Sequence, residues 1–180
     1  MKQLIYIICC FCAISSYAQN DVGSINMTFT LSQVAMLDLE PDNLPLTLKI
    51  AAPNDAGEKA LIVAANNNKW INFSSAVFPG NSRSISIQME LGQKVPPGIY
   101  LKLNTAKYSG LGKGELGSAT SVVTLNDTPQ TIVSNIKGAY TGNGDDNGYK
   151  LTYELEIYDY KLLDFDQSAT LSITLTLSDL

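Results

Sequence analysis

The residues best suited to metal chemistry by type and spacing lie in one stretch, NGDDNGYKLTYE, at positions 143–154. Oxygen-bearing side chains occupy its first, third and fifth positions, a glycine its sixth and a glutamate its twelfth, which is the spacing of an EF-hand calcium loop. Such a loop needs a helix after it to bring the glutamate onto the ion. Apolar and polar residues alternate over 149–157, which predicts a strand there. Glu154 would then lie about 20 Å from Gly148, at roughly 3.3 Å per residue.

The stretch is therefore interpreted as a turn between two strands, because glycine and asparagine tolerate the positive φ angles that tight turns require. A weak calcium site is kept as an alternative, with Asp145, Asp146 and backbone carbonyls as its ligands. We expect no other metal and no cofactor.

Side chains for covalent or acid–base catalysis are scarce in the rest of the chain. The 180 residues include no histidine, and the three cysteines are Cys9, Cys10 and Cys12. A Ser-His-Asp triad needs an imidazole, a thiol nucleophile needs a cysteine, and structural zinc sites use cysteine and histidine. Glu154 and Glu156 share a strand face, as a glycosidase pair does, but they are interpreted as the wet face of that strand. We expect no enzyme, and no residue is assigned a catalytic role.

The first eighteen residues have the pattern of a signal peptide. Lys2 gives a basic start, residues 4–14 (LIYIICCFCAI) are apolar, and Ser16 and Ala18 are small residues at the positions that a signal peptidase reads. Cleavage after Ala18 leaves 180 − 18 = 162 residues without cysteine and changes the formal net charge from −5 to −6. A buried N-terminal helix is the alternative. The expected location is the periplasm, the cell surface or the extracellular medium.

Charge and patterning also exclude classes of partner. An acidic chain without a basic stripe is a poor nucleic-acid binder. Serine and threonine occupy the polar strand faces, as on a water-facing surface, so we do not expect an integral membrane protein. The run GKGELG (112–117) matches G-x-G-x-x-G, the pattern of dinucleotide-binding loops. In those loops a helix follows the glycines, whereas a strand is expected here. The run is interpreted as an exposed glycine-rich loop between strands.

Alternation with period two runs through most of the chain and predicts strands with one buried and one wet face. The strictest alternation covers residues 24–32, 44–50, 84–91, 98–105, 149–157 and 170–179. Shorter β-branched runs cover 59–65, 70–74, 119–125 and 130–136, and all four are typical of central strands. Turn signals separate the runs, and no stretch keeps a helical period for three turns. We predict one all-β domain over 19–180, an antiparallel β-sandwich of about nine or ten strands.

One aromatic residue is a candidate ligand contact. Trp70, the single tryptophan, shares a strand face with Asn72, while Ile71 and Phe73 take the other face. An exposed tryptophan can stack on a sugar ring. Packing in or near the core is the alternative for Trp70.

Two segments resemble known proteins. Residues 24–41 (SINMTFTLSQVAMLDLEP) are similar to the start of pilin subunits of the colonisation-factor type, and residues 151–180 resemble the last strands of secreted pilin-like sandwiches. The chain from residue 19 onward also resembles small exported β proteins of Bacteroidota. The resemblance implies an Ig-like sandwich assembled by strand donation, in which an extended segment of one subunit completes a sheet of the next.

The donor side chains would be Ile25, Met27, Phe29 and Leu31, and the alternative is that this segment is the first strand of its own sheet. The expected function is a non-enzymatic structural or adhesive role at the surface, in a fibre subunit assembled by strand donation. Its partners would be further copies of itself or other surface subunits. The alternative function is a carbohydrate- or ligand-binding module of the periplasm or cell surface.

Overall fold

The structure is a computed structural model that describes residues 26–42, 44–65, 68–164 and 168–180. The predicted signal peptide, residues 1–18, and the donor candidate Ile25 lie outside the described residues. The chain divides into two units, unit 1 (Met1–Leu31) and unit 2 (Ser32–Leu180). The described residues form strands and one short 3-10 helix, η1 (Tyr160–Leu162). Within them, no helix has the length and apolar character needed to cross a bilayer.

The larger sheet of unit 2 has seven strands in the order β7-β11-β4-β12-β6-β9, with β1 paired to β4. These strands are β1 (Val34–Glu40), β4 (Asn68–Ala76), β6 (Ile99–Thr105), β7 (Lys113–Gly114), β9 (Val122–Thr124), β11 (Ala139–Tyr140) and β12 (Tyr149–Ile157). All their pairings are antiparallel. One edge of β4 pairs with β1, and its other edge pairs with β11 and then with β12.

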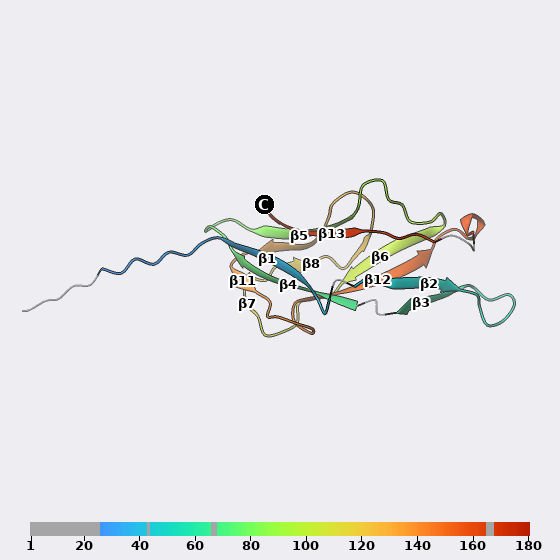
Figure 1. Cartoon of the computed structure of the whole chain (residues 1–180), viewed down its shortest axis with the longest axis horizontal. Helices are drawn as coiled ribbons and strands as arrows, with labels where there is room; N and C mark the ends of the chain where they lie inside the picture. The colour runs from blue at the N-terminus through green and yellow to red at the C-terminus, as the bar shows by residue number, and fades with distance from the viewer. Residues whose placement is uncertain (1–25, 43, 66–67, 165–167) are drawn as a thin grey trace, which may run out of the picture. The chain divides into compact units, whose positions relative to one another are not determined.

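A four-stranded sheet, in the order β13-β5-β10-β8, and a separate hairpin complete unit 2. The strands of the sheet are β5 (Arg83–Met89), β8 (Ser118–Ala119), β10 (Gln130–Ile136) and β13 (Ile173–Asp179), and those of the hairpin are β2 (Thr47–Ala51) and β3 (Leu61–Ala65). Figure 1 shows β5 and β13 on the opposite side of unit 2 from β2 and β3, with β6 and β12 between them.

The inner faces of the two larger sheets share one core. The larger sheet contributes Ile71, Leu103 and Leu151, and the four-stranded sheet contributes Ile85 and Ile87, each 0% exposed. Along β5 and the first half of β12, fully buried side chains recur at every second residue. Two antiparallel sheets facing one apolar layer are the arrangement of a β-sandwich. The all-β antiparallel prediction is confirmed.

Several strands differ from the sequence-based expectation. The strands predicted over 130–136 and 149–157 are β10 and β12 with the same bounds. Residues 26–32, part of the first predicted strand, form no strand, and the first strand in the described chain is β1, which begins at Val34. Thirteen strands are described instead of nine or ten. Of the four runs expected to be central, 70–74 and 130–136 lie in β4 and β10, each with neighbouring strands on both edges, whereas 59–65 and 119–125 contain β3 and β9, which each end a sheet.

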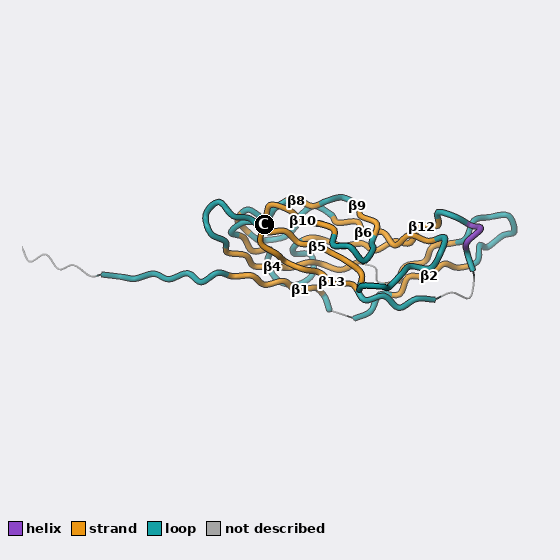
Figure 2. The backbone as a smooth tube through the Cα atoms, turned by 90° about the horizontal axis from the view of Figure 1, so that it is seen from above, coloured by secondary structure: helices purple, strands orange, loops and turns teal. Residues whose placement is uncertain are grey.

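One buried cation connects the two larger sheets. Arg83, at the start of β5, is 1% exposed. Its Nε donates to Asp179 Oδ1 at 2.6 Å, and its Nη1 donates to the Val34 carbonyl and to Ser75 Oγ. The guanidinium therefore joins the beginning of β1, the end of β13 and β4, and Figure 2 shows β1 and β13 side by side along this edge.

Candidate functional site

Unit 2 contains a long apolar groove, which we call the β2–β13 groove. Its sides are β2 with the residues just before it and the chain around the start of β13, and its floor comes from β6 and β12. Six aliphatic side chains dominate these surfaces: Leu46, Leu48, Leu101, Leu155, Ile173 and Leu175. The volume is about 1090 Å³, above the range of roughly 300–1,000 Å³ that is usual for small-molecule sites. Its volume is large enough for the side chains of an inserted segment of chain.

Side chains that face the core along this groove are incompletely covered. Ile173 and Leu175 stand opposite Met89 and Ile87 in the register of β13 with β5. Opposed residues of an antiparallel pair project from the same face of the sheet. Yet Ile87 is 0% exposed and Met89 is 4% exposed, whereas Ile173 and Leu175 are only half-buried. The sandwich is therefore left open along the groove.

The strand on one side of the groove also has a free backbone edge. Among the described strands, β13 pairs with β5 alone. The Glu90 N–H donates to the Ser172 carbonyl and the Leu180 N–H to the Ser82 carbonyl, and the register between them has no shift. Along an antiparallel strand, successive residues direct their backbone N–H and C=O groups alternately to one neighbouring strand and to the other. Ser172 and Leu180 direct theirs to β5, so Ile173 and Leu175 direct theirs away from β5, to the free edge. Across the groove, β2 has a described partner only in β3.

The buried lysine of the groove is already paired. Lys69, on the inner face of β4, is 1% exposed. Its Nζ donates to Asp42 Oδ1 at 2.5 Å and to the Asp42 carbonyl at 2.9 Å. The Lys69 ammonium and the Leu44 N–H, both bonded to this carboxylate, hold the pKa of Asp42 below its usual range. An occupant of the groove therefore meets no uncompensated charge from Lys69.

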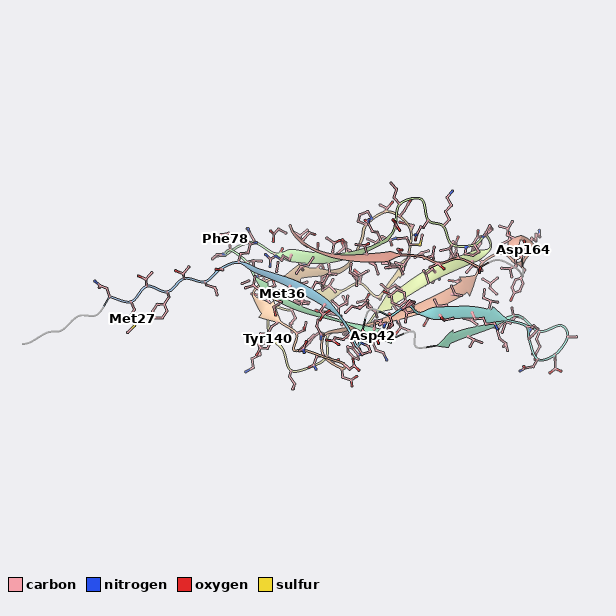
Figure 3. All side chains as sticks on the ribbon, viewed as in Figure 1. Met27, Met36, Asp42, Phe78, Tyr140 and Asp164 are labelled. Atoms are coloured by element: carbon pink, nitrogen blue, oxygen red, sulfur yellow. The ribbon has the colours of Figure 1, made fainter. Side chains whose placement is uncertain are left out.

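The predicted donor residues belong to unit 1, and three of the four are described. Residues 26–31 have no regular secondary structure, and Met27, Phe29 and Leu31 are 70%, 89% and 86% exposed. Figure 3 shows Met27 projecting from an extended backbone. The stretch carries no charged residue. It therefore presents an apolar side chain at every second position, without burying any of the three.

The predicted calcium ligands Asp145 and Asp146 are exposed in a turn that the Asn147 side chain helps to hold. The Asn147 amide donates to the carbonyls of Asn143 and Asp145, at 3.0 and 3.2 Å, and accepts from Leu111 N–H. Among the described residues, no three Asp, Glu, His or Cys side chains gather to hold an ion. The strand β12 follows the turn as predicted.

Trp70 and the glycine-rich run are placed by neighbouring strands. Trp70 is half-buried on the outer face of β4, opposite Glu40 and Lys150, and does not line the β2–β13 groove.

The glycine-rich run at 112–117 contains β7, which pairs with β11. A Cβ on Gly112 would lie 2.0 Å from the Tyr140 carbonyl. These glycines therefore permit close backbone packing against β11, rather than forming only an exposed loop.

Comparisons with protein-family models, with curated proteins and with solved structures find no match. The functional argument therefore depends on the chain's own geometry. Sequence reasoning identified the exposed alternating segment but not the groove. The available signal was the pair of strongly alternating runs, 44–50 and 170–179, in which the core-facing leucines and isoleucines from Leu46 onward remain half-buried.

Proposed function

We propose that this chain is an exported, non-enzymatic sandwich protein of the Ig-like or pilin-like kind, with a structural role at the cell surface, and that its copies join by strand donation. The observation that carries the proposal is the β2–β13 groove, an open apolar channel beside a free strand edge. The occupant is the segment at residues 25–31 of another copy, whose described residues, 26–31, are exposed. Its destination after export is the periplasm, the cell surface or the medium.

The donor and the groove agree in period. Ile173 and Leu175, the β13 side chains that line the groove, are two residues apart, as are Met27, Phe29 and Leu31. In an extended strand, side chains two positions apart project from the same face at a spacing of roughly 6.6 Å. Met27, Phe29 and Leu31 would thus enter the groove together, while Thr28 and Thr30 face water. This is the side-chain pattern by which an added strand is recognised at a sheet edge.

Backbone and charge support the same pairing. The outward N–H and C=O groups of Ile173 and Leu175 would pair with the donor backbone, which removes an unpaired edge of the kind that invites association. The donor is uncharged, and the buried Lys69 of the groove is neutralised by Asp42. The donor would also cover the half-buried Ile173 and Leu175, so that apolar burial drives the association.

Light scattering of the purified protein over a range of concentrations tests this assignment. We expect oligomers whose size grows with concentration, and monomers for the triple variant Met27→Ser, Phe29→Ser, Leu31→Ser. The matched control is Thr28→Ala with Thr30→Ala, on the opposite face of the same segment, which should assemble as the unmodified protein does.

Mixing two defective variants sharpens the test. A groove variant, Leu48→Glu with Leu175→Glu, should keep its donor segment but accept none, and its thermal unfolding is checked first. Mixed with the triple donor variant, it should give heterodimers and nothing larger, since only one joint can form. A monomeric unmodified protein at every concentration, or oligomers of the donor variant, would contradict strand donation.

A further inference from the structure

A second cavity lies on the outer face of the larger sheet. Its lining comes from β1, β4, β11 and residues 142–143, and its volume is about 440 Å³. On β4 the lining side chains include Asn72 and Ser74, whose neighbours Ile71 and Phe73 point into the core. The cavity is therefore separated from the core and from the β2–β13 groove by the sheet itself. We call it the outer-face cavity.

A small residue between two large ones shapes one end of this cavity. Met36 and Tyr140 both stand opposite Ser74 in register, one across β1–β4 and the other across β4–β11. Residues opposed in this way share a sheet face. Met36 is 67% exposed and Tyr140 is 48% exposed, and Figure 3 shows both at the same end of unit 2. The result is a notch with a serine floor and two apolar walls.

The other end of the cavity carries hydrogen-bond acceptors. Asp38 stands opposite Asn72 in register. Asn72 is 4% exposed; its Nδ2 donates to the Gly144 carbonyl at 3.1 Å, and its Oδ1 is buried close to Gly148 without a hydrogen-bond partner. The acceptor that the cavity offers to a ligand is therefore the Asp38 carboxylate. The Asp38 carboxylate is exposed and forms no ion pair with a described residue.

We propose that the outer-face cavity binds a neutral saccharide. An apolar face of the sugar ring packs on Tyr140 and Met36, and ring hydroxyls donate to the Asp38 carboxylate. This carboxylate accepts hydrogen bonds, so the ligand must donate, as hydroxyls do. The negative charge of Asp38 disfavours acidic sugars. Aromatic and aliphatic walls with a few placed polar groups are the usual composition of such sites.

A cation is the other ligand that acceptor oxygens attract, and the walls argue against it. Calcium takes six to eight oxygen ligands. Here the lining has a single carboxylate, and two of its largest side chains, Met36 and Tyr140, are mainly apolar. The saccharide site goes beyond strand donation, because it uses the opposite face of the sheet and is complete within one copy.

Backbone-amide NMR of the full-length protein, titrated with maltose, cellobiose, lactose and mannobiose, tests the proposal. At least one of these sugars should shift the amide signals of Ser74, Tyr140 and Gly142 in a saturable way, while glucuronic acid and calcium chloride should not. Calcium-induced shifts without sugar-induced ones would overturn the proposal in favour of a cation site. The absence of any shift with all four sugars would also overturn it.

Two variants locate the binding. Tyr140→Ser should weaken the affinity about tenfold through loss of the stacking surface, and Asp38→Asn should admit glucuronic acid. The matched control is Tyr160→Ser, since Tyr160 is 54% exposed in η1, away from the cavity. Thermal unfolding of all three should match the unmodified protein. Equal affinity of the two tyrosine variants would place the sugar elsewhere. The triple donor variant should still bind, which separates this site from strand donation.

Discussion

Replacing Phe29 by alanine gives a quantitative test of strand donation. Phe29 is 89% exposed in the subunit, so insertion into a groove would remove nearly the whole ring from water. Full burial of a phenylalanine side chain is worth about 1.5–3 kcal/mol. The substitution should therefore cost about 2 kcal/mol at each joint. Because about 1.4 kcal/mol corresponds to a factor of ten, the apparent Kd between subunits should rise roughly 30-fold.

The assay is a dilution series followed by light scattering, in which the concentration at half-dissociation gives the apparent Kd. Leu31→Ala, at a residue that is 86% exposed, should shift this concentration in the same direction. Thr28→Ala changes a neighbour on the opposite face and should shift it by less than about threefold, the upper end of an exposed-site effect. Equal shifts for Phe29→Ala and Thr28→Ala would refute the reasoning, because side-chain alternation would then play no part in the association.

Three further predictions concern stability. Burial raises the pKa of Tyr149 and Tyr153 to about 12. Because ionisation is easier in the unfolded chain, the free energy of unfolding should fall by up to about 3 kcal/mol per tyrosine as pH rises from about 10 to about 12. Urea unfolding at each pH measures this change, and constant stability over that range would contradict it. Gly148→Ala should lower the free energy of unfolding by more than about 3 kcal/mol, and Gly144→Ala by about 1 kcal/mol. Both glycines have positive φ, but only at Gly148 would a Cβ lie 2.0 Å from a backbone carbonyl oxygen. Equal shifts in the urea midpoint would show that this contact does not affect stability. Asp42→Asn should destabilise the protein at neutral pH, and the difference in urea midpoint should disappear as pH falls through the lowered pKa of Asp42; a difference that persists in strong acid would assign it to packing.

The sequence predicted best the strands that have one buried face, one exposed face and a neighbouring strand at each edge. In β12, residues 149, 151 and 153 are buried and residues 154 and 156 are exposed, and the strand is paired with β4 and β6. The strands β7 and β11 have only two residues each, too few to show a period. In β1 the adjacent Met36 and Leu37 break the alternation, and the strand forms through its pairing with β4.

The candidate site was half predictable for a related reason. An exposed donor is a local feature, since the alternation of Met27, Phe29 and Leu31 is visible within one short run. The β2–β13 groove is built from segments far apart in the chain, and alternation tells which side chains face inward without telling whether anything covers them. The outer-face cavity depends on the register that sets Ser74 between Met36 and Tyr140, which period alone does not determine.

The position of Arg83 has a mechanical consequence for such a fibre. The chain enters unit 2 just before Val34, whose carbonyl Arg83 holds, whereas Leu39, near the other end of β1, lines the β2–β13 groove. In a fibre joined by strand donation, the donor and acceptor surfaces would thus be different, and the joints between them would be heterologous contacts that propagate head to tail as an open filament. Tension on such a joint would pull on the subunit along β1. The seven residue pairs between β1 and β4 would be loaded in shear and would resist together. The Arg83 guanidinium would transmit part of this force to β13 through Asp179. Both of the larger sheets would then bear the force.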